Sequence, residues 1–149
     1  MGEQRAELHD RLPLIIRRNE AETRDIPDDR GRATAYPFPD SESSIDMHVI
    51  ELTPGGPNGR FHFHSRNENI YLILEGTIEL RLADRVESLS AGDSAWIPPG
   101  VPHAVAADPA VGARLLEIYW PAPSDFVEVV AGDEGHAVSP HPSAPRSDP

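Results

Sequence analysis

The chain has 149 residues, a length that fits one domain with a buried core. Its 25 acidic and 13 basic residues give a formal net charge of -12, which disfavours binding to nucleic acid or to an anionic membrane. The absence of cysteine excludes disulfides, thiolate metal ligands and a cysteine nucleophile. No apolar run approaches the roughly 20 residues of a membrane span. The N-terminus lacks the basic and apolar regions of a secretory signal, so we expect a cytoplasmic location.

Residues 1–40 are charged and only weakly periodic, and we predict that they form an N-terminal arm. In residues 41–130, short apolar runs are separated by glycine or proline turns, and a tight turn is expected at Glu75-Gly76. The predicted strands are 47–52, 60–64, 70–74, 77–82, 94–97, 103–106 and 114–119. This pattern predicts an all-β, closed jelly-roll barrel whose interior holds a ligand.

Residues 131–149 are rich in proline and polar residues and cannot build a packed core. We therefore predict a disordered C-terminal tail.

Two histidines, His62 and His64, stand two positions apart in the run Phe61-His62-Phe63-His64. In an extended strand both imidazoles face one side, and the two phenylalanines face the other. A pair of imidazoles can chelate a divalent cation but leaves it undercoordinated. A third histidine, His103, follows the turn Pro98-Pro99-Gly100, and we predict that it joins them in one metal site.

The fourth candidate ligand is Glu68, which lies four residues after His64. Asn69 is the alternative, because a β-bulge at residues 65–69 could direct either side chain inward. We favour Glu68, since its negative charge suits a cation.

The spacing of these residues resembles the two motifs of the cupin family. The first motif has a glycine, a His-x-His pair, a glutamate three or four residues later, and a glycine that ends the next strand. The second has a glycine, five residues, Pro-x-Gly, two residues and a histidine. The corresponding residues are Gly56, His62, His64, Glu68, Gly76, Gly92, Pro98, Gly100 and His103. Two departures are that Ala107 replaces the family's terminal asparagine and that the commoner distance to Gly76 would make Asn69 the ligand.

The resemblance covers about residues 45–120 and implies a single cupin barrel, the double-stranded β-helix or jelly roll. It also implies a divalent metal held by His62, His64, Glu68 and His103, with iron, manganese, nickel, zinc and copper all acceptable to such ligands. A homodimer formed through the arm or a sheet edge is a further implication.

Candidate substrate-binding residues stand near the predicted ligands. They are Arg60, Tyr71, Trp96, Glu117 and Tyr119, with Trp120 as a further wall residue. Arg60 and Arg66 flank the histidine pair, and either could steer a carboxylate or an enolate toward the metal.

Three classes of function fit these features. An open metal site favours an enzyme acting on a small organic metabolite, most of all a dioxygenase, with an isomerase, cyclase or lyase as the non-redox alternative. A metabolite-binding protein without turnover is the second class. A metal-free, epimerase-like barrel with a histidine base and a tyrosine acid is the third.

Overall fold

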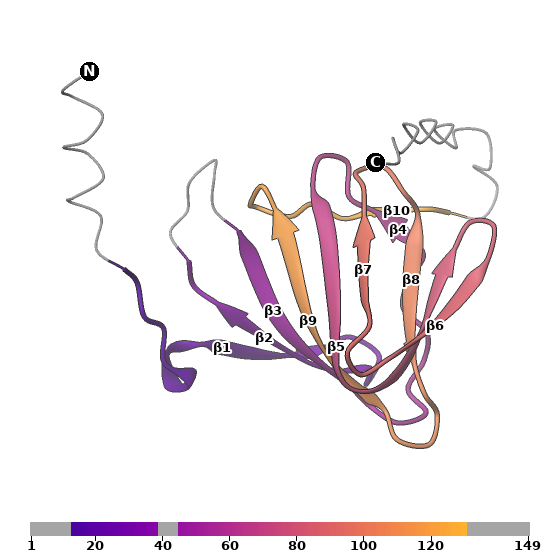
Figure 1. Cartoon of the computed structure of the whole chain (residues 1–149), viewed down its shortest axis with the longest axis horizontal. Coiled ribbons are helices and arrows are strands. Elements are labelled where there is room, and N and C mark those ends of the chain that lie inside the picture. The colour runs from indigo at the N-terminus through magenta and orange to yellow at the C-terminus, as the bar shows by residue number, and fades with distance from the viewer. Residues whose placement is uncertain (1–12, 39–44, 131–149) are drawn as a thin grey trace, which may run out of the picture.

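A computed structural model describes residues 13–38 and 45–130 of the chain, and almost all of its regular structure is β-strand (Figure 1). A short 3-10 helix, η1 (Arg18–Glu20), precedes the first strand. The strands are β1 (Glu22–Ile26), β2 (Gly31–Tyr36), β3 (Asp46–Leu52), β4 (His62–Phe63), β5 (Glu68–Leu82), β6 (Val86–Ser90), β7 (Ser94–Ile97), β8 (His103–Ala107), β9 (Ala113–Trp120) and β10 (Val127–Glu128).

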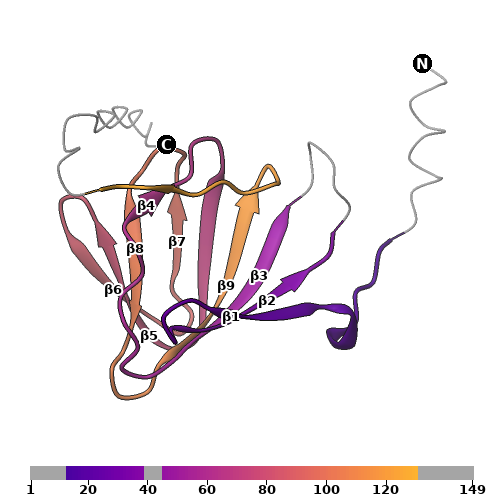
Figure 2. The same cartoon turned by 180° about the vertical axis from the view of Figure 1, so that it is seen from behind.

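The strands form one curled antiparallel sheet in the order β1-β2-β3-β9-β5-β8-β4-β10, and β6 and β7 also pair with β5. Seen from behind, β1 and the segment that leads to β10 cross the open side of the curled sheet (Figure 2). The prediction of an all-β jelly-roll barrel is confirmed. No helix in the described residues is long and apolar enough to cross a membrane.

The prediction of two strands at 70–74 and 77–82 is wrong, because β5 runs unbroken from Glu68 to Leu82. The expected turn at Glu75-Gly76 is a register shift between Ile73 and Glu75 in the pairing of β5 with β9. Gly76 has a φ of +73°, and a Cβ there would overlap the carbonyl oxygen of Gly112. Glycine therefore permits a bulge where the sequence predicts a reversal.

The bulge also changes which residues of β5 face the barrel interior. Before it, the buried positions are Asn69, Tyr71 and Ile73, and after it they are Ile78 and Leu80. A shift of one residue reverses the side on which every later side chain lies. The core of the barrel is formed by Leu52, Tyr71, Ile73, Ile78, Leu80, Ile97 and Leu115.

The arm predicted for residues 1–40 contains β1 and β2 in its described part. β2 pairs with β3 over six residue pairs, from Gly31 with Leu52 to Tyr36 with Met47. This segment therefore extends the barrel sheet and supplies part of the cavity wall. The boundary predicted at residue 40 and the tail at residues 131–149 lie outside the described residues.

Candidate metal centre

Three histidines meet inside the barrel. His62 on β4 and His103 on β8 are cross-strand partners, which places their side chains next to each other. His64 follows on the same side of the chain as His62, as two-residue spacing predicts. One ring nitrogen from each lies within 4.8 Å of the other two. His64 and His103 are buried and His62 is half-buried, and the three residues lie close enough together that the group could hold a metal ion.

Each of the three imidazoles is oriented by a backbone carbonyl oxygen. The Nδ1 atom of His62 lies 2.8 Å from the carbonyl oxygen of Arg60, and that of His103 lies 2.9 Å from the carbonyl oxygen of Val101. The Nδ1 atom of His64 bonds to the carbonyl oxygen of Asp125. Because each Nδ1–H donates, each Nε2 keeps its lone pair for a metal, the arrangement usual around metal-binding histidines.

Burial holds two of these imidazoles in the neutral form. Loss of hydration is the largest cause that lowers the pKa of His62, and of His103, to about 4 in each case. The backbone hydrogen bonds act in the opposite direction, and the neighbouring histidines add further depression. Neutral imidazole is the form that binds metal, so protons compete weakly at neutral pH.

The predicted fourth ligand does not reach the histidines. Glu68 lies on the opposite side of β5, where its Oε2 atom accepts a hydrogen bond of 3.0 Å from the indole nitrogen of Trp96. Asn69 faces inward and is fully buried. The preference for Glu68 is corrected for a simple reason: Asn69, Tyr71 and Ile73 form the inward row of β5, and the pairing of β5 with β9 has no register shift between Glu68 and Ile73.

The Asn69 amide touches the histidine group directly. Its Nδ2 atom lies 3.3 Å from Nε2 of His103 and 3.5 Å from Nε2 of His64. The same nitrogen lies 3.0 Å from the hydroxyl of Tyr71 and 3.5 Å from Oε1 of Glu117. Its Oδ1 atom is buried without a hydrogen-bond partner among the described residues. An oxygen in that condition is available for a ligand.

A cavity of about 470 Å³ opens beside His62. Four of the five predicted substrate-binding residues line it, namely Arg60, Tyr71, Glu117 and Tyr119. Burial, reinforced by the charge of Glu117, raises the pKa of both phenols well above its ordinary value. The two tyrosines therefore stay protonated beside a carboxylate.

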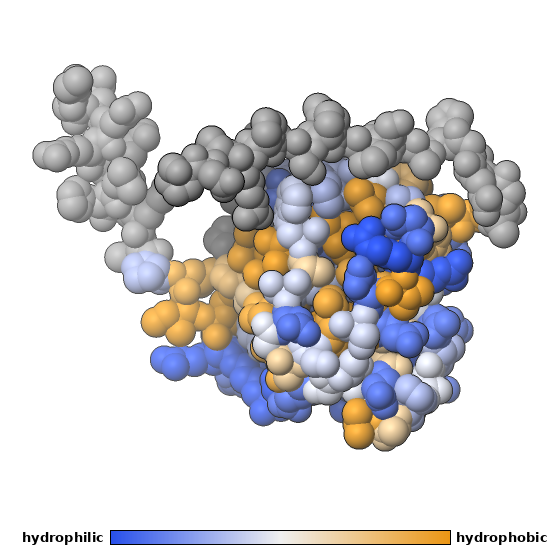
Figure 3. Space-filling model, turned by 45° about the vertical axis from the view of Figure 1, so that its right-hand side comes forward, coloured by the Kyte–Doolittle hydropathy of each residue, from blue (hydrophilic) through white to orange (hydrophobic). Residues whose placement is uncertain are grey.

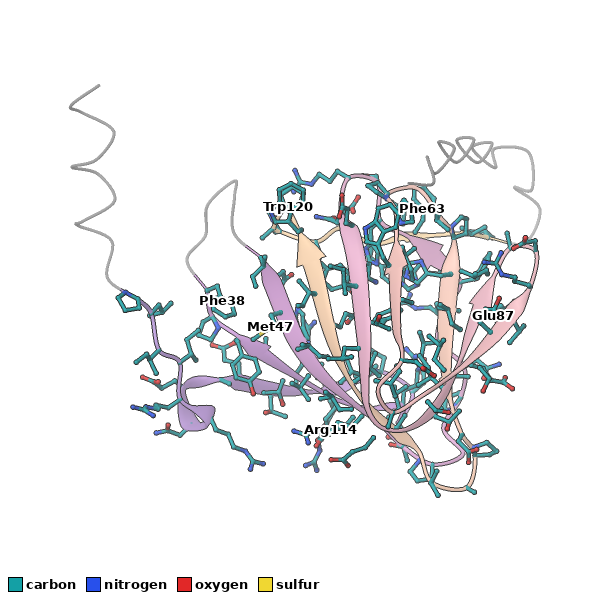
Figure 4. The ribbon with its side chains drawn as sticks, viewed as in Figure 1. Phe38, Met47, Phe63, Glu87, Arg114 and Trp120 are labelled. Atoms are coloured by element: carbon teal, nitrogen blue, oxygen red, sulfur yellow. The ribbon has the colours of Figure 1, made fainter. Side chains whose placement is uncertain are left out.

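The fifth predicted residue, Trp96, lies elsewhere. Its side chain is 60% exposed and belongs to the outer surface of the sheet with Glu68. Trp120 is also exposed, at 46%, and Figure 4 places it at the rim of the barrel, at the end of β9. The structure therefore excludes both tryptophans from the wall of this cavity.

The segment after β9 closes one side of the site, and the sequence analysis did not detect it. The Phe126 ring stacks on His62 with a centroid distance of 4.0 Å, and the Arg60 guanidinium lies 5.0 Å from that ring. The Asp125 carboxylate accepts the backbone N–H of Ser65, with Oδ1 at 2.9 Å. Buried Asn67 binds the same segment through the carbonyl oxygen of Pro123. The aromatic residue at position 126 is visible in the sequence, but its contact with His62, far away in the chain, is not.

Arg30 is a second residue that the sequence analysis missed. It stands in the turn between β1 and β2 and lines the same cavity. Arg66, which was a candidate for steering a substrate, instead donates to the carbonyl oxygen of Pro123 at 3.2 Å.

The barrel and the buried histidines define a small β-barrel protein with a candidate metal centre. Comparison with known proteins places it in a family: the cupin domain matches residues 48–119. Quercetin 2,3-dioxygenase of Bacillus subtilis is 32% identical over 96 residues, and the match spans 63% of this chain but only 27% of that protein. The chain belongs to the cupin superfamily.

Solved structures agree with this assignment. An RmlC-like cupin from Shewanella frigidimarina is 25% identical, with a TM-score of 0.59, covering 70% of this chain and 86% of the other. The polyketide cyclase RemF from Streptomyces resistomycificus has the same fold with a TM-score of 0.63 at 22% identity, covering 82% and 89%.

Proposed function

We propose that this protein is a metal-dependent enzyme that acts on a small organic molecule. The observation that carries the proposal is the convergence of one ring nitrogen from each of His62, His64 and His103, beside a cavity of about 470 Å³. A purely structural histidine cluster has no need of three Nδ1 atoms fixed by carbonyl oxygens, an arrangement that leaves each Nε2 atom free for a metal.

Asn69 is proposed as the fourth donor. Its buried Oδ1 atom lacks a partner among the described residues, and a half-turn of the amide would exchange that oxygen with the nitrogen that faces His64 and His103. An amide oxygen and three imidazoles form an all-neutral donor set. Such a set suits iron, manganese, nickel, zinc or copper, and it leaves the full charge of a divalent ion uncompensated. The site would therefore favour an anionic substrate.

The bound ion would supply Lewis-acid or redox chemistry. An octahedral ion with four protein donors keeps two positions open, which suits an oxygenase, and the relationship to quercetin 2,3-dioxygenase supports this choice. A non-redox isomerase, cyclase or lyase is the second candidate. The shared fold with a polyketide cyclase favours it, and the same four donors could hold a metal for non-redox chemistry. A third candidate is a metabolite-binding protein without catalytic activity, which would need the cavity but not the three histidines.

The chain's own residues would then position the substrate and move its protons. Glu117 lies in the cavity wall beside Tyr71 and Tyr119, so it would accept a proton from a bound substrate. The protonated phenols would donate hydrogen bonds to oxygen atoms of the substrate. Phe126 and Tyr119 would exclude water from the histidine side.

The first test is the metal content per chain, measured by elemental mass spectrometry on protein purified without chelators or added metal. We expect close to one metal ion per chain, and a sharp decrease in His62→Ala, His64→Ala and His103→Ala. His48→Asn is the matched control, because His48 is a buried histidine on β3 that lies outside the group. Iron, manganese, nickel or copper would direct the next assay to oxygen consumption, and zinc to non-redox chemistry.

Homodimerisation and a cytoplasmic location are also part of the proposal. The outer surface of β5 carries Ile70, Leu72 and Leu74, each more than a third exposed, and Trp96 on β7 extends this apolar surface. Hydrophobic residues also reach the surface elsewhere, among hydrophilic ones, on the face seen in Figure 3. Exposed apolar rows of this kind favour self-association. Sedimentation of the full chain and of Leu72→Glu would test the dimer.

A further inference from the structure

Arg30 projects into the cavity from the turn between β1 and β2, and the fold provides a specific seat for it. Its Nε atom donates to the carbonyl oxygen of Pro57 and its Nη2 atom to that of Val105, each at 3.3 Å. A Cβ at residue 59 would lie 2.6 Å from Nη2, so Gly59 leaves the space that the guanidinium occupies. An arginine whose side chain only extended into solvent would need neither this space nor these hydrogen bonds.

The charge of Arg30 has no carboxylate partner among the described residues. Arg60, which lines the same cavity, pairs with Glu128 at 3.0 Å, whereas Arg30 forms no ion pair in the described part of the chain. The same part of the chain gives its Nη1 atom no hydrogen-bond partner. A half-buried cation whose donors are only partly used can bind an anion.

The position of Arg30 relates it to the histidine group. Its charge contributes to the lowered pKa of His62, after burial, and it opposes the rise in the pKa of Tyr71. Arg30 therefore lines the same cavity as His62 and Tyr71, and its charge acts on both.

We propose that Arg30 binds the carboxylate of a small organic acid whose remaining part extends toward the three histidines. This inference rests on the proposed function, because it names the class of substrate for that site. The carboxylate would accept two N–H bonds from the guanidinium, in the geometry that arginine offers to planar anions. Arg60, which lines the same cavity, would add to the attraction.

The lining of the cavity favours a carboxylate over a phosphate. Its charged residues balance, with Arg24, Arg30 and Arg60 against Asp25, Asp28 and Glu117. One negative charge near Arg30 is therefore tolerated, but a dianion would be repelled by Glu117. The apolar part of the ligand would lie against Ile26, Ile50, Leu52, Val105 and Leu115. Burial of these surfaces would add affinity that inorganic anions cannot gain.

The test compares benzoate with benzamide, which has nearly the same shape without the charge. NMR titration of the full chain, first treated with a chelator, measures both affinities without a contribution from metal. We expect benzoate to bind at least about tenfold more tightly than benzamide, and Arg30→Gln to weaken benzoate about 10- to 100-fold. Arg32→Gln is the matched control, because Arg32 is exposed and pairs with Asp25.

Equal affinities for benzoate and benzamide in the wild-type chain would overturn the proposal without any variant. Unchanged benzoate binding in Arg30→Gln would overturn it as well. Arg30→Lys keeps the charge and loses the planar fork, so it serves if the glutamine variant does not fold, with an expected loss smaller than that of glutamine. Inorganic phosphate that binds as tightly as benzoate, with the same dependence on Arg30, would refute the carboxylate assignment. Metal content separates the proposed metal-dependent function from the proposed role of Arg30. If the chain binds metal but does not bind benzoate, only the role of Arg30 is refuted.

Discussion

The stability of the metal-free protein should depend on pH through its buried histidines, and His103 offers the clearest case. Its side chain is fully buried, and burial is the main cause that lowers its pKa to about 4. In the unfolded chain the same group has a pKa of about 6.5. Between these two values the unfolded state binds more protons than the folded state, so the free energy of unfolding falls as the pH decreases.

The size of the effect follows from the two pKa values. At pH 7.5 the histidine is neutral in both states and the penalty is close to zero. At pH 5 the unfolded chain is almost fully protonated and the folded chain is not, which lowers the free energy of unfolding by about 2 kcal/mol. The full penalty, reached below pH 4, is about 3 kcal/mol.

Urea denaturation of the chelator-treated protein at pH 7.5, 6 and 5 measures this effect. The His103→Asn variant is the reference, since an amide does not titrate and can still donate a hydrogen bond to the carbonyl oxygen of Val101. Titration of carboxylates is common to both proteins and cancels in the comparison. The wild-type chain should lose about 2 kcal/mol more than the variant between pH 7.5 and pH 5. Parallel curves for the two proteins would refute the assignment of a neutral buried imidazole.

Three other predictions concern the metal and the barrel. Asn69→Leu should weaken binding of added zinc at least about tenfold in isothermal titration, while Glu68→Gln should not change it; the opposite result would restore Glu68 as a ligand. Zinc at 100 times its dissociation constant should stabilise the chain by about 2.7 kcal/mol in urea denaturation, and should not stabilise His64→Ala to that extent. Gly76→Ala should lower the free energy of unfolding by about 1–3 kcal/mol, more than Gly92→Ala, because a Cβ at residue 92 meets no atom within 4 Å. Equal losses in the two variants would show that backbone strain at positive φ, and not the close contact with Gly112, causes the destabilisation.

The group of three histidines could be predicted from the sequence because its geometry is local. Side chains two residues apart on a strand share a face, so His62 and His64 had to point together. The turn before His103 places it opposite, and the structure pairs it with His62. The fourth candidate ligand could not be chosen from local spacing, since the residue that faces inward depends on the register of β5 against β9. A change of one position separates Asn69 from Glu68.

A different reason explains why the sequence analysis missed β1, β6 and β10. β1 has four exposed residues among its five, and β6 has four among five, so neither shows the alternation by which a half-buried strand is recognised. β10 has only two residues and exists because it pairs with β4. Such strands are stabilised by hydrogen bonds to neighbours that are distant in the chain, and their own residues carry little signal.

Both predicted and missed residues line one cavity. The histidines lie on β4 and β8 and in the segment after β4, whereas Arg30 and Phe126 come from segments that precede β2 and follow β9. Their positions depend on contacts such as those of Arg30 with Val105 and of Asp125 with Ser65, which join residues far apart in the chain. Proteins that share the fold can therefore keep a similar histidine group and differ in everything that touches the substrate. The chemistry that a metal could supply here follows from the histidines, but the choice of substrate has to be inferred from Arg30 and its neighbours.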